Sequence, residues 1–132
     1  MPSNLKKNWI GVDLDGTLSK YTNDPTWPIG DPVPEMVDRV KQWLADGRDV
    51  RIFTARVDGG LCERYCELPV EWQDKYRRIT PIVDMVQAWC LEHVGVKLPV
   101  TNRKDADMEV LWDDRCVQVV RNTGRPVLQD DT

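Results

Sequence analysis

The sequence predicts an α/β domain built as a three-layer sandwich around a mostly parallel sheet. Short apolar runs, typical of buried strands, alternate with two segments whose apolar residues recur at helical spacing. Acidic or hydroxyl residues follow several of these runs, and parallel sheets gather such side chains at the carboxyl ends of their strands. The chain has 132 residues, which is room for one core, so we expect residues 1–132 to form a single domain.

The first half of the chain predicts a strand, a loop and a helix. Residues 8–14 read as a buried strand that runs into an acidic turn, and residues 21–30 are rich in Asn, Asp, Pro and Gly, as loops are. In the helix that follows, Asp31 suits the N-cap, Pro32 the first helical position and Gly47 the stop. Its apolar face is Val33, Met36, Val37, Val40, Trp43 and Leu44.

The second half predicts a strand, a long connection, a helix and three short strands. Residues 49–54 form the strand, and residues 57–79 follow it as an inserted segment without a dominant period. The next helix opens at Thr80 and ends at Gly95. The remaining strands are predicted at residues 98–101, 108–112 and 116–120.

The strand at 98–101 is predicted to be very short. Pro99 places it at a sheet edge. If that edge lies beyond the strand at 49–54, the chain must return past three strand spacings to begin the strand at 108–112. Residues 102–107 span at most roughly 20 Å, against about 14 Å sideways plus the length of a strand.

Composition excludes several classes of protein. The net charge is −4, which disfavours broad nucleic-acid binding through a basic surface. No apolar run approaches the ~18 residues of a membrane span, so we expect no membrane partner. The apolar stretch after Lys7 is cut off by Asp13, unlike a secretory signal. Four cysteines in a chain with ample core residues do not suggest a disulfide framework, and we expect a cytoplasmic location.

The segment Asp13-Leu14-Asp15-Gly16-Thr17 is the strongest local signal. Two carboxylates at a strand end can share one cation or one reacting group. Beside a cation, Asp13 can act as a nucleophile while Asp15 handles protons. Gly16 lets the backbone turn sharply. Taken alone, the same residues also fit an Asp-rich turn that caps a helix.

Further polar residues follow the other predicted strands. The Thr54 hydroxyl can hold a phosphate oxygen, and Arg56 can pair bidentately with a phosphate or a carboxylate. Asp113 and Asp114 repel each other unless a cation such as Mg²⁺ neutralises them. Lys104 could neutralise phosphate charge. Taken singly, these residues also fit an ordinary strand end, surface basic side chains and an Asp-Asp turn.

In this order, the motifs resemble the haloacid dehalogenase superfamily over roughly residues 8–120. The matching signatures are Asp13 to Leu18, Thr54-Ala55-Arg56, Lys104 and Asp113-Asp114. The resemblance implies a Rossmann-like fold and a Mg²⁺-dependent phosphohydrolase that acts on a phosphomonoester through an aspartyl-phosphate. Because only residues 19–30 separate the first signature from the helix, it implies a minimal, capless member. An open site is compatible with a bulky substrate, such as a nucleotide or polynucleotide end, or with a second copy as a lid.

The resemblance also implies a role for each matching residue. Asp13 would take the phosphoryl group, and Asp15 would protonate the leaving oxygen and later activate water. Thr54 and Lys104 would hold the transferring group. The alternatives to Lys104 are Arg103 and Lys97. The candidate ligands of Mg²⁺ are Asp13, the backbone carbonyl of Asp15, Asp113 and Asp114. The candidate substrate-binding residues are Thr17, Arg56 and Arg115.

For the segment 57–79 and for the cysteines, we expect a structural role rather than a role in binding. The aromatic and arginine residues of segment 57–79 could stack a base, but a surface excursion whose aromatic residues cover the core is the favoured interpretation. A zinc set of Cys62, Cys66, Cys90 and His93 lacks a familiar spacing, so we expect buried thiols, with Cys116 also in the core.

Two other functions remain open. A phosphoryl-accepting signalling domain of receiver type also uses Asp, Mg²⁺, Thr and Lys, but there the acceptor Asp sits on a middle strand and the Lys comes last. A catalytically silent scaffold is the third hypothesis. Like charges without a metal would destabilise such a scaffold.

Overall fold

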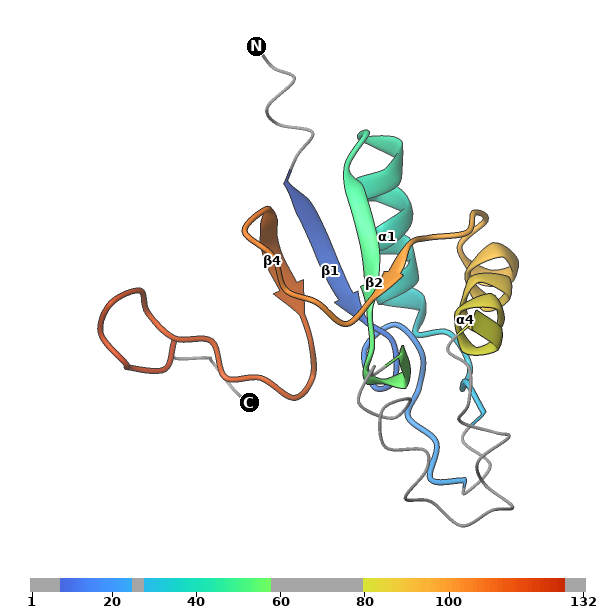
Figure 1. Ribbon diagram of the computed structural model, residues 1–132, viewed down its shortest axis with the longest axis horizontal. Coiled ribbons are helices and arrows are strands. Elements are labelled where there is room, and N and C mark those ends of the chain that lie inside the picture. Colours follow the sequence, from blue (N-terminus) through green and yellow to red (C-terminus); the bar gives the residue numbers. More distant parts are fainter. Residues whose placement is uncertain (1–7, 25–27, 58–79, 128–132) are drawn as a thin grey trace.

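Four parallel strands form one sheet in the spatial order β3-β2-β1-β4. The strands are β1 (Trp9–Asp13), β2 (Asp49–Phe53), β3 (Val100–Thr101) and β4 (Met108–Trp112). The computed structural model describes residues 8–24, 28–57 and 80–127 (Figure 1). The α/β class and the parallel pairing predicted from the sequence are confirmed.

Both described α-helices pack on the same face of this sheet. Helix α1 (Pro34–Ala45) links β1 to β2, and α4 (Thr80–His93) lies between β2 and β3 in the chain. Each step moves one strand further in the same direction, and right-handed crossovers in one direction place their helices on one face. Figure 1 shows α1 behind β2, with α4 beyond β3. The part of the chain described here therefore has two layers, and the predicted third layer is not seen in it.

The core lies between the sheet and these helices. Alternate residues of the two central strands point toward them: Ile10 and Val12 from β1, Val50 and Ile52 from β2. The helices contribute Met36, Val37, Val40, Val86, Trp89 and Cys90. Cys90 is buried as predicted, and burial raises the pKa of its thiol to about 11. Among the described residues, no helix has the length and apolar character that crossing a membrane requires.

The opposite face of the sheet is crossed by residues 102–107, which run from β3 to the start of β4 (Figure 1). The buried Trp9 fixes this crossing: its Nε1 donates to Asp105 Oδ1 at 2.8 Å, and its backbone N–H donates to the Asp107 carbonyl at 3.0 Å. The short β3 at the edge beside β2 confirms the prediction that was based on the reach of this segment.

Helix α1 begins two residues later than predicted. Pro34 rather than Pro32 is its first residue, and Val33 rather than Asp31 precedes it. Backbone hydrogen bonds to residues 18–20 hold the preceding stretch extended, so no helical turn can form before Pro34.

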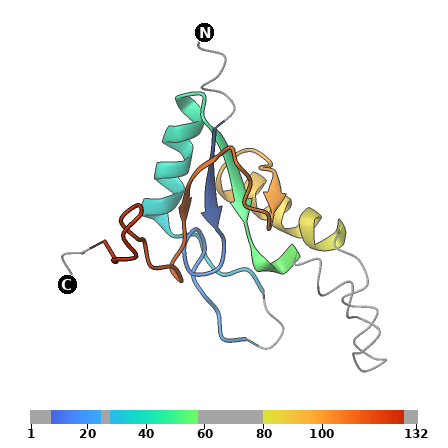
Figure 2. The same ribbon diagram turned by 60° about the vertical axis from the view of Figure 1, so that its left-hand side comes forward.

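The predicted strand at 116–120 is absent from the described structure, where Val119 of this stretch forms an isolated antiparallel bridge with Pro126. Cys116, expected in the core, is exposed. Directly after β4, the Arg115 N–H donates to Asp113 Oδ1 at 2.9 Å, and this turn directs the chain away from the sheet. Figure 2 shows the segment projecting from the sheet. The predicted insert 57–79, apart from Val57, lies outside the described residues, as do Cys62 and Cys66.

Candidate active site

The chain turns sharply directly after Asp13, the last residue of β1. The backbone N–H groups of Leu18 and Ser19 both donate to the Leu14 carbonyl, at 3.0 and 2.9 Å. The side chains of Leu14 and Leu18 are fully buried and anchor the turn in the core. The carboxylates of Asp13 and Asp15 are therefore carried by a well-held backbone.

Gly16 meets two requirements of this turn that another residue would not. Its φ is +93°, in the region that favours glycine. A Cβ built on Gly16 would collide with the carboxylate of Asp114. The glycine predicted to permit the turn thus also makes room for an acid from the far end of the sequence.

Asp113 and Asp114 reach Asp13 because β1 and β4 are neighbours. Val12 pairs with Trp112, so the residues after the two strands meet at one edge of the sheet. One carboxylate oxygen from each of Asp13, Asp113 and Asp114 lies within 4.8 Å of the other two. Hard divalent cations such as Mg²⁺ bind carboxylate oxygens, so this donor set fits the ion predicted from the sequence.

The electrostatics of the cluster also fit a cation. The pKa of the Asp13 carboxyl is raised from 3.8 to about 7, first by burial and then by a hydrogen bond with Asp114 and by the charges of Asp113 and Asp114. Only the hydrogen bond from Thr17 acts in the other direction. Three acids so close hold more negative charge than their surroundings neutralise, which a divalent cation would correct.

The Thr17 hydroxyl connects the two acidic segments. It accepts a hydrogen bond from the Asp114 N–H at 3.1 Å, and its own hydrogen can reach Asp13 Oδ2 at 3.2 Å or Asp114 Oδ1 at 3.4 Å. Thr17, a predicted substrate-binding residue, lies where it orients two candidate metal ligands.

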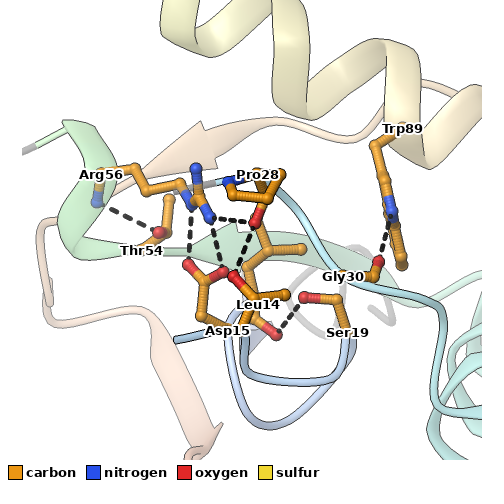
Figure 3. Close-up of polar contacts among 9 residues, drawn as sticks. Leu14, Asp15, Ser19, Pro28, Gly30, Thr54, Arg56 and Trp89 are labelled. Atoms are coloured by element: carbon orange, nitrogen blue, oxygen red, sulfur yellow. Dashed lines mark hydrogen bonds and ion pairs between the residues drawn. The ribbon is translucent and has the colours of Figure 1, made fainter. Parts of the chain in front are cut away.

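Asp15 has a different partner. Arg56 donates two hydrogen bonds to it, Nε to Oδ2 and Nη2 to Oδ1, both at 2.7 Å (Figure 3). The side chain of Arg56 is 2% exposed and that of Asp15 is 16% exposed. The bidentate pairing predicted for Arg56 is therefore present, but with a carboxylate of the protein, and Arg56 holds Asp15 in place.

Thr54 follows β2 and is buried at the same edge of the sheet. Its Oγ1 accepts a hydrogen bond from the Arg56 N–H at 3.1 Å, at the start of the short 3₁₀ helix η2 (Ala55–Val57). Because the hydroxyl accepts this bond, its hydrogen can be donated to a ligand oxygen.

These residues surround a cavity of about 530 Å³. Its wall consists of Asp13, Asp15, Tyr21, Thr54, Ala55, Asp114 and Arg115. The structure thus brings together acids from β1 and β4 with the threonine after β2, as the predicted parallel sheet required. Arg115, a predicted substrate-binding residue, also lies on the wall.

The predicted basic residue of the site does not reach this wall. Lys104 lies on the segment that crosses the opposite face of the sheet, and it is exposed. Its alternatives Arg103 and Lys97 are exposed too, and neither lines the cavity. Tyr21 had no predicted role. The available signal was an aromatic residue in a polar loop close behind the Asp13 turn.

No family model, curated protein or solved structure matches this chain.

Proposed function

We propose that the chain is a Mg²⁺-dependent phosphohydrolase that cleaves a phosphomonoester through an aspartyl-phosphate on Asp13. The observation that carries the proposal is the pair of acids in one cavity. Asp13 meets two more carboxylates, and Asp15 is held by the buried Arg56. A cation-dependent nucleophile beside a separately oriented acid–base group is what phosphoryl transfer through an aspartate requires.

The reaction needs two displacements at phosphorus. In the first, Asp15 starts in its protonated form: a carboxylate oxygen of Asp13 attacks, the bond from phosphorus to the alcohol oxygen breaks, and the proton of Asp15 passes to that oxygen. In the second, Asp15 takes a proton from a water molecule, whose oxygen attacks phosphorus. Inorganic phosphate leaves and the Asp13 carboxylate is restored.

The remaining residues position the groups that react. Arg56 orients the carboxylate of Asp15 through its two hydrogen bonds. Thr54 and Arg115 provide a hydroxyl donor and a positive charge for the phosphate oxygens. Mg²⁺, held by Asp13, Asp113 and Asp114 with the backbone carbonyl of Asp15, would neutralise the charge of the phosphoryl group.

The finer description of the fold belongs to the same proposal. A minimal, capless fold of the haloacid dehalogenase type is supported by the order of the motifs and by the acids that follow the adjacent strands β1 and β4. Proteins that share a sheet topology differ widely in chemistry, so the function rests on the site residues rather than on the sheet.

The experiment is Mg²⁺-dependent phosphate release from a small aryl phosphate. We compare the unchanged chain with Asp13→Asn, and use Asp38→Asn as the matched control because Asp38 is exposed on α1. We expect turnover in the unchanged chain and in the control, and loss of turnover on chelation and in Asp13→Asn.

Three results would contradict the proposal. A long-lived phosphoryl adduct without turnover would indicate a phosphoryl-accepting domain. Failure to bind Mg²⁺ would indicate a silent scaffold. Turnover that survives Asp13→Asn would show that another group is the nucleophile.

A further inference from the structure

Tyr21 is an exposed aromatic residue on the wall of the acidic cavity. Tyr21 is 68% exposed, and it is the only aromatic among the highly exposed large hydrophobic residues of the described part of the chain. An exposed ring beside charged groups is a surface on which a planar ligand can stack.

The residues on both sides of Tyr21 are held in place. The Lys20 N–H donates to the Asp31 carbonyl at 2.7 Å, and the Thr22 hydroxyl donates to the Pro28 carbonyl at 3.2 Å. The Lys20 carbonyl packs so closely on Gly30 that a Cβ there would collide with it. Tyr21 therefore projects from a strap, residues 20–22 and 28–31, whose described residues are fixed by their partners.

The same strap is tied to the candidate acid–base group and to the core. Arg56 Nη2, which holds Asp15, also donates to the Pro28 carbonyl at 3.2 Å (Figure 3). Trp89 of α4 donates from Nε1 to the Gly30 carbonyl at 3.1 Å. The position of the Tyr21 backbone is thus coupled to that of Asp15, so ligand binding has to order the ring alone and not the chain that carries it.

Arg115 supplies the second half of a recognition site. It lies on the same cavity wall, and its guanidinium has no hydrogen-bond or ion-pair partner in the described part of the chain. A guanidinium can bind a phosphate while the ring of Tyr21 stacks on a planar part of the alcohol that the phosphate esterifies.

We propose that Tyr21 is a stacking platform for a nucleobase, and that the substrates are phosphate monoesters of nucleosides. The proposal rests on the proposed phosphohydrolase function and names its substrate class. The nucleoside phosphate can be a free mononucleotide or the phosphorylated end of an oligonucleotide, because both present the same base and ester.

The test compares a substrate that carries a base with one that has a hydroxyl at the same sugar carbon. We measure kcat/KM for a nucleoside 5′-monophosphate and for ribose 5-phosphate in the unchanged chain, Tyr21→Ala, Tyr21→Phe and the exposed control Met85→Ala. We expect a preference for the nucleotide that falls on the order of tenfold in Tyr21→Ala, because stacking depends on the ring. Tyr21→Phe and Met85→Ala keep the preference, and turnover of ribose 5-phosphate changes little. A 5′-phosphorylated oligonucleotide as a third substrate distinguishes the two sources.

Equal losses on both substrates in Tyr21→Ala, or a preference that does not change, would overturn the stacking proposal. If no phosphate is released from any substrate, the proposed function fails. The stacking proposal is then tested by ligand binding. Calorimetry with Mg²⁺ compares the same nucleotide with ribose 5-phosphate. Tighter nucleotide binding that is lost in Tyr21→Ala upholds the platform, and equal binding of the two ligands removes it.

Discussion

Asp13 and Asp15 are two residues apart in the chain but have opposite electrostatic surroundings. Asp15 faces a buried arginine that donates two hydrogen bonds at 2.7 Å. Asp13 faces two more carboxylates, and its pKa is raised to about 7. The protein itself supplies the cation for one acid, while the other is left with an excess of negative charge that an external cation can neutralise.

This difference separates two roles that a pair of aspartates could otherwise share. A carboxylate with a built-in partner keeps one orientation, which suits proton transfer in a defined direction. A carboxylate in an acidic cluster becomes fully ionised when a metal binds, which suits a nucleophile. Variants that change the surroundings of Asp15, of Asp13 or of the cavity wall test this difference.

The largest effect is expected when Asp15 loses its partner. Arg56→Ala leaves the Asp15 carboxylate without a cation in a largely buried position, and breaking such a pair costs about 3–5 kcal/mol of folding free energy. Chemical denaturation measures this loss. Arg48→Ala is the control because the Arg48–Glu109 ion pair is more exposed, and we expect it to cost about 1 kcal/mol or less. Equal losses of folding free energy in the two variants would show that the Arg56–Asp15 pair stabilises the fold no more than an exposed ion pair does.

Removal of metal should expose the unbalanced charge at Asp13. The folded-state pKa of about 7 lies above the ordinary 3.8, so the folded protein holds this proton more tightly than the unfolded chain. The contribution of Asp13 to stability is therefore complete below about pH 4 and declines until the pH passes about 7.

Thermal unfolding in a chelator tests this sign. We expect Tm to fall between pH 5 and pH 8 by on the order of 5 °C more in the unchanged chain than in Asp13→Asn. Saturating Mg²⁺ should remove this difference. A Tm that rises over the same range relative to Asp13→Asn would contradict the assigned surroundings of Asp13.

Substitution of Thr17 tests whether Mg²⁺ binding by the acidic cluster depends on the neutral hydroxyl beside it. Thr17→Ala removes the hydroxyl that bonds to both Asp13 and Asp114, and loss of such support typically weakens metal binding by at least about tenfold. Calorimetric titration with Mg²⁺ measures the change. Thr17→Ser retains the hydroxyl and should bind nearly as well as the unchanged chain, and a loss as large as that of Thr17→Ala would point to the methyl group instead.

The smallest effect is expected at Lys104. Because Arg115 lines the cavity and Lys104 does not, Arg115→Ala should lower kcat/KM by about tenfold and Lys104→Ala by less than about twofold. Phosphate release at several substrate concentrations separates the two. The reverse order would show that Lys104 approaches the phosphate during turnover, as the family resemblance implies.

Much of the site could be predicted because parallel strands end at one edge. Asp13, Thr54 and Asp114 each follow an apolar run, so their meeting required only that the runs be neighbouring parallel strands. The position of Lys104 was harder to predict, since it depends on the path by which the chain returns across the sheet. That both described α-helices cover one face of the sheet also follows from the order of the strands in space. The alternation of strands and helices along the sequence does not give that order.

The sequence by itself determined which acids could cooperate, since the residue types at the ends of apolar runs and the Gly16 turn are local properties. Only the tertiary structure decided which partner each acid meets. Arg56 could have bound a phosphate or a carboxylate, and it contacts Asp15, 41 positions away in sequence. Asp114 reaches Thr17 across 97 positions. Such pairings are set by strand order and crossovers, because local chain preferences act over only a few residues.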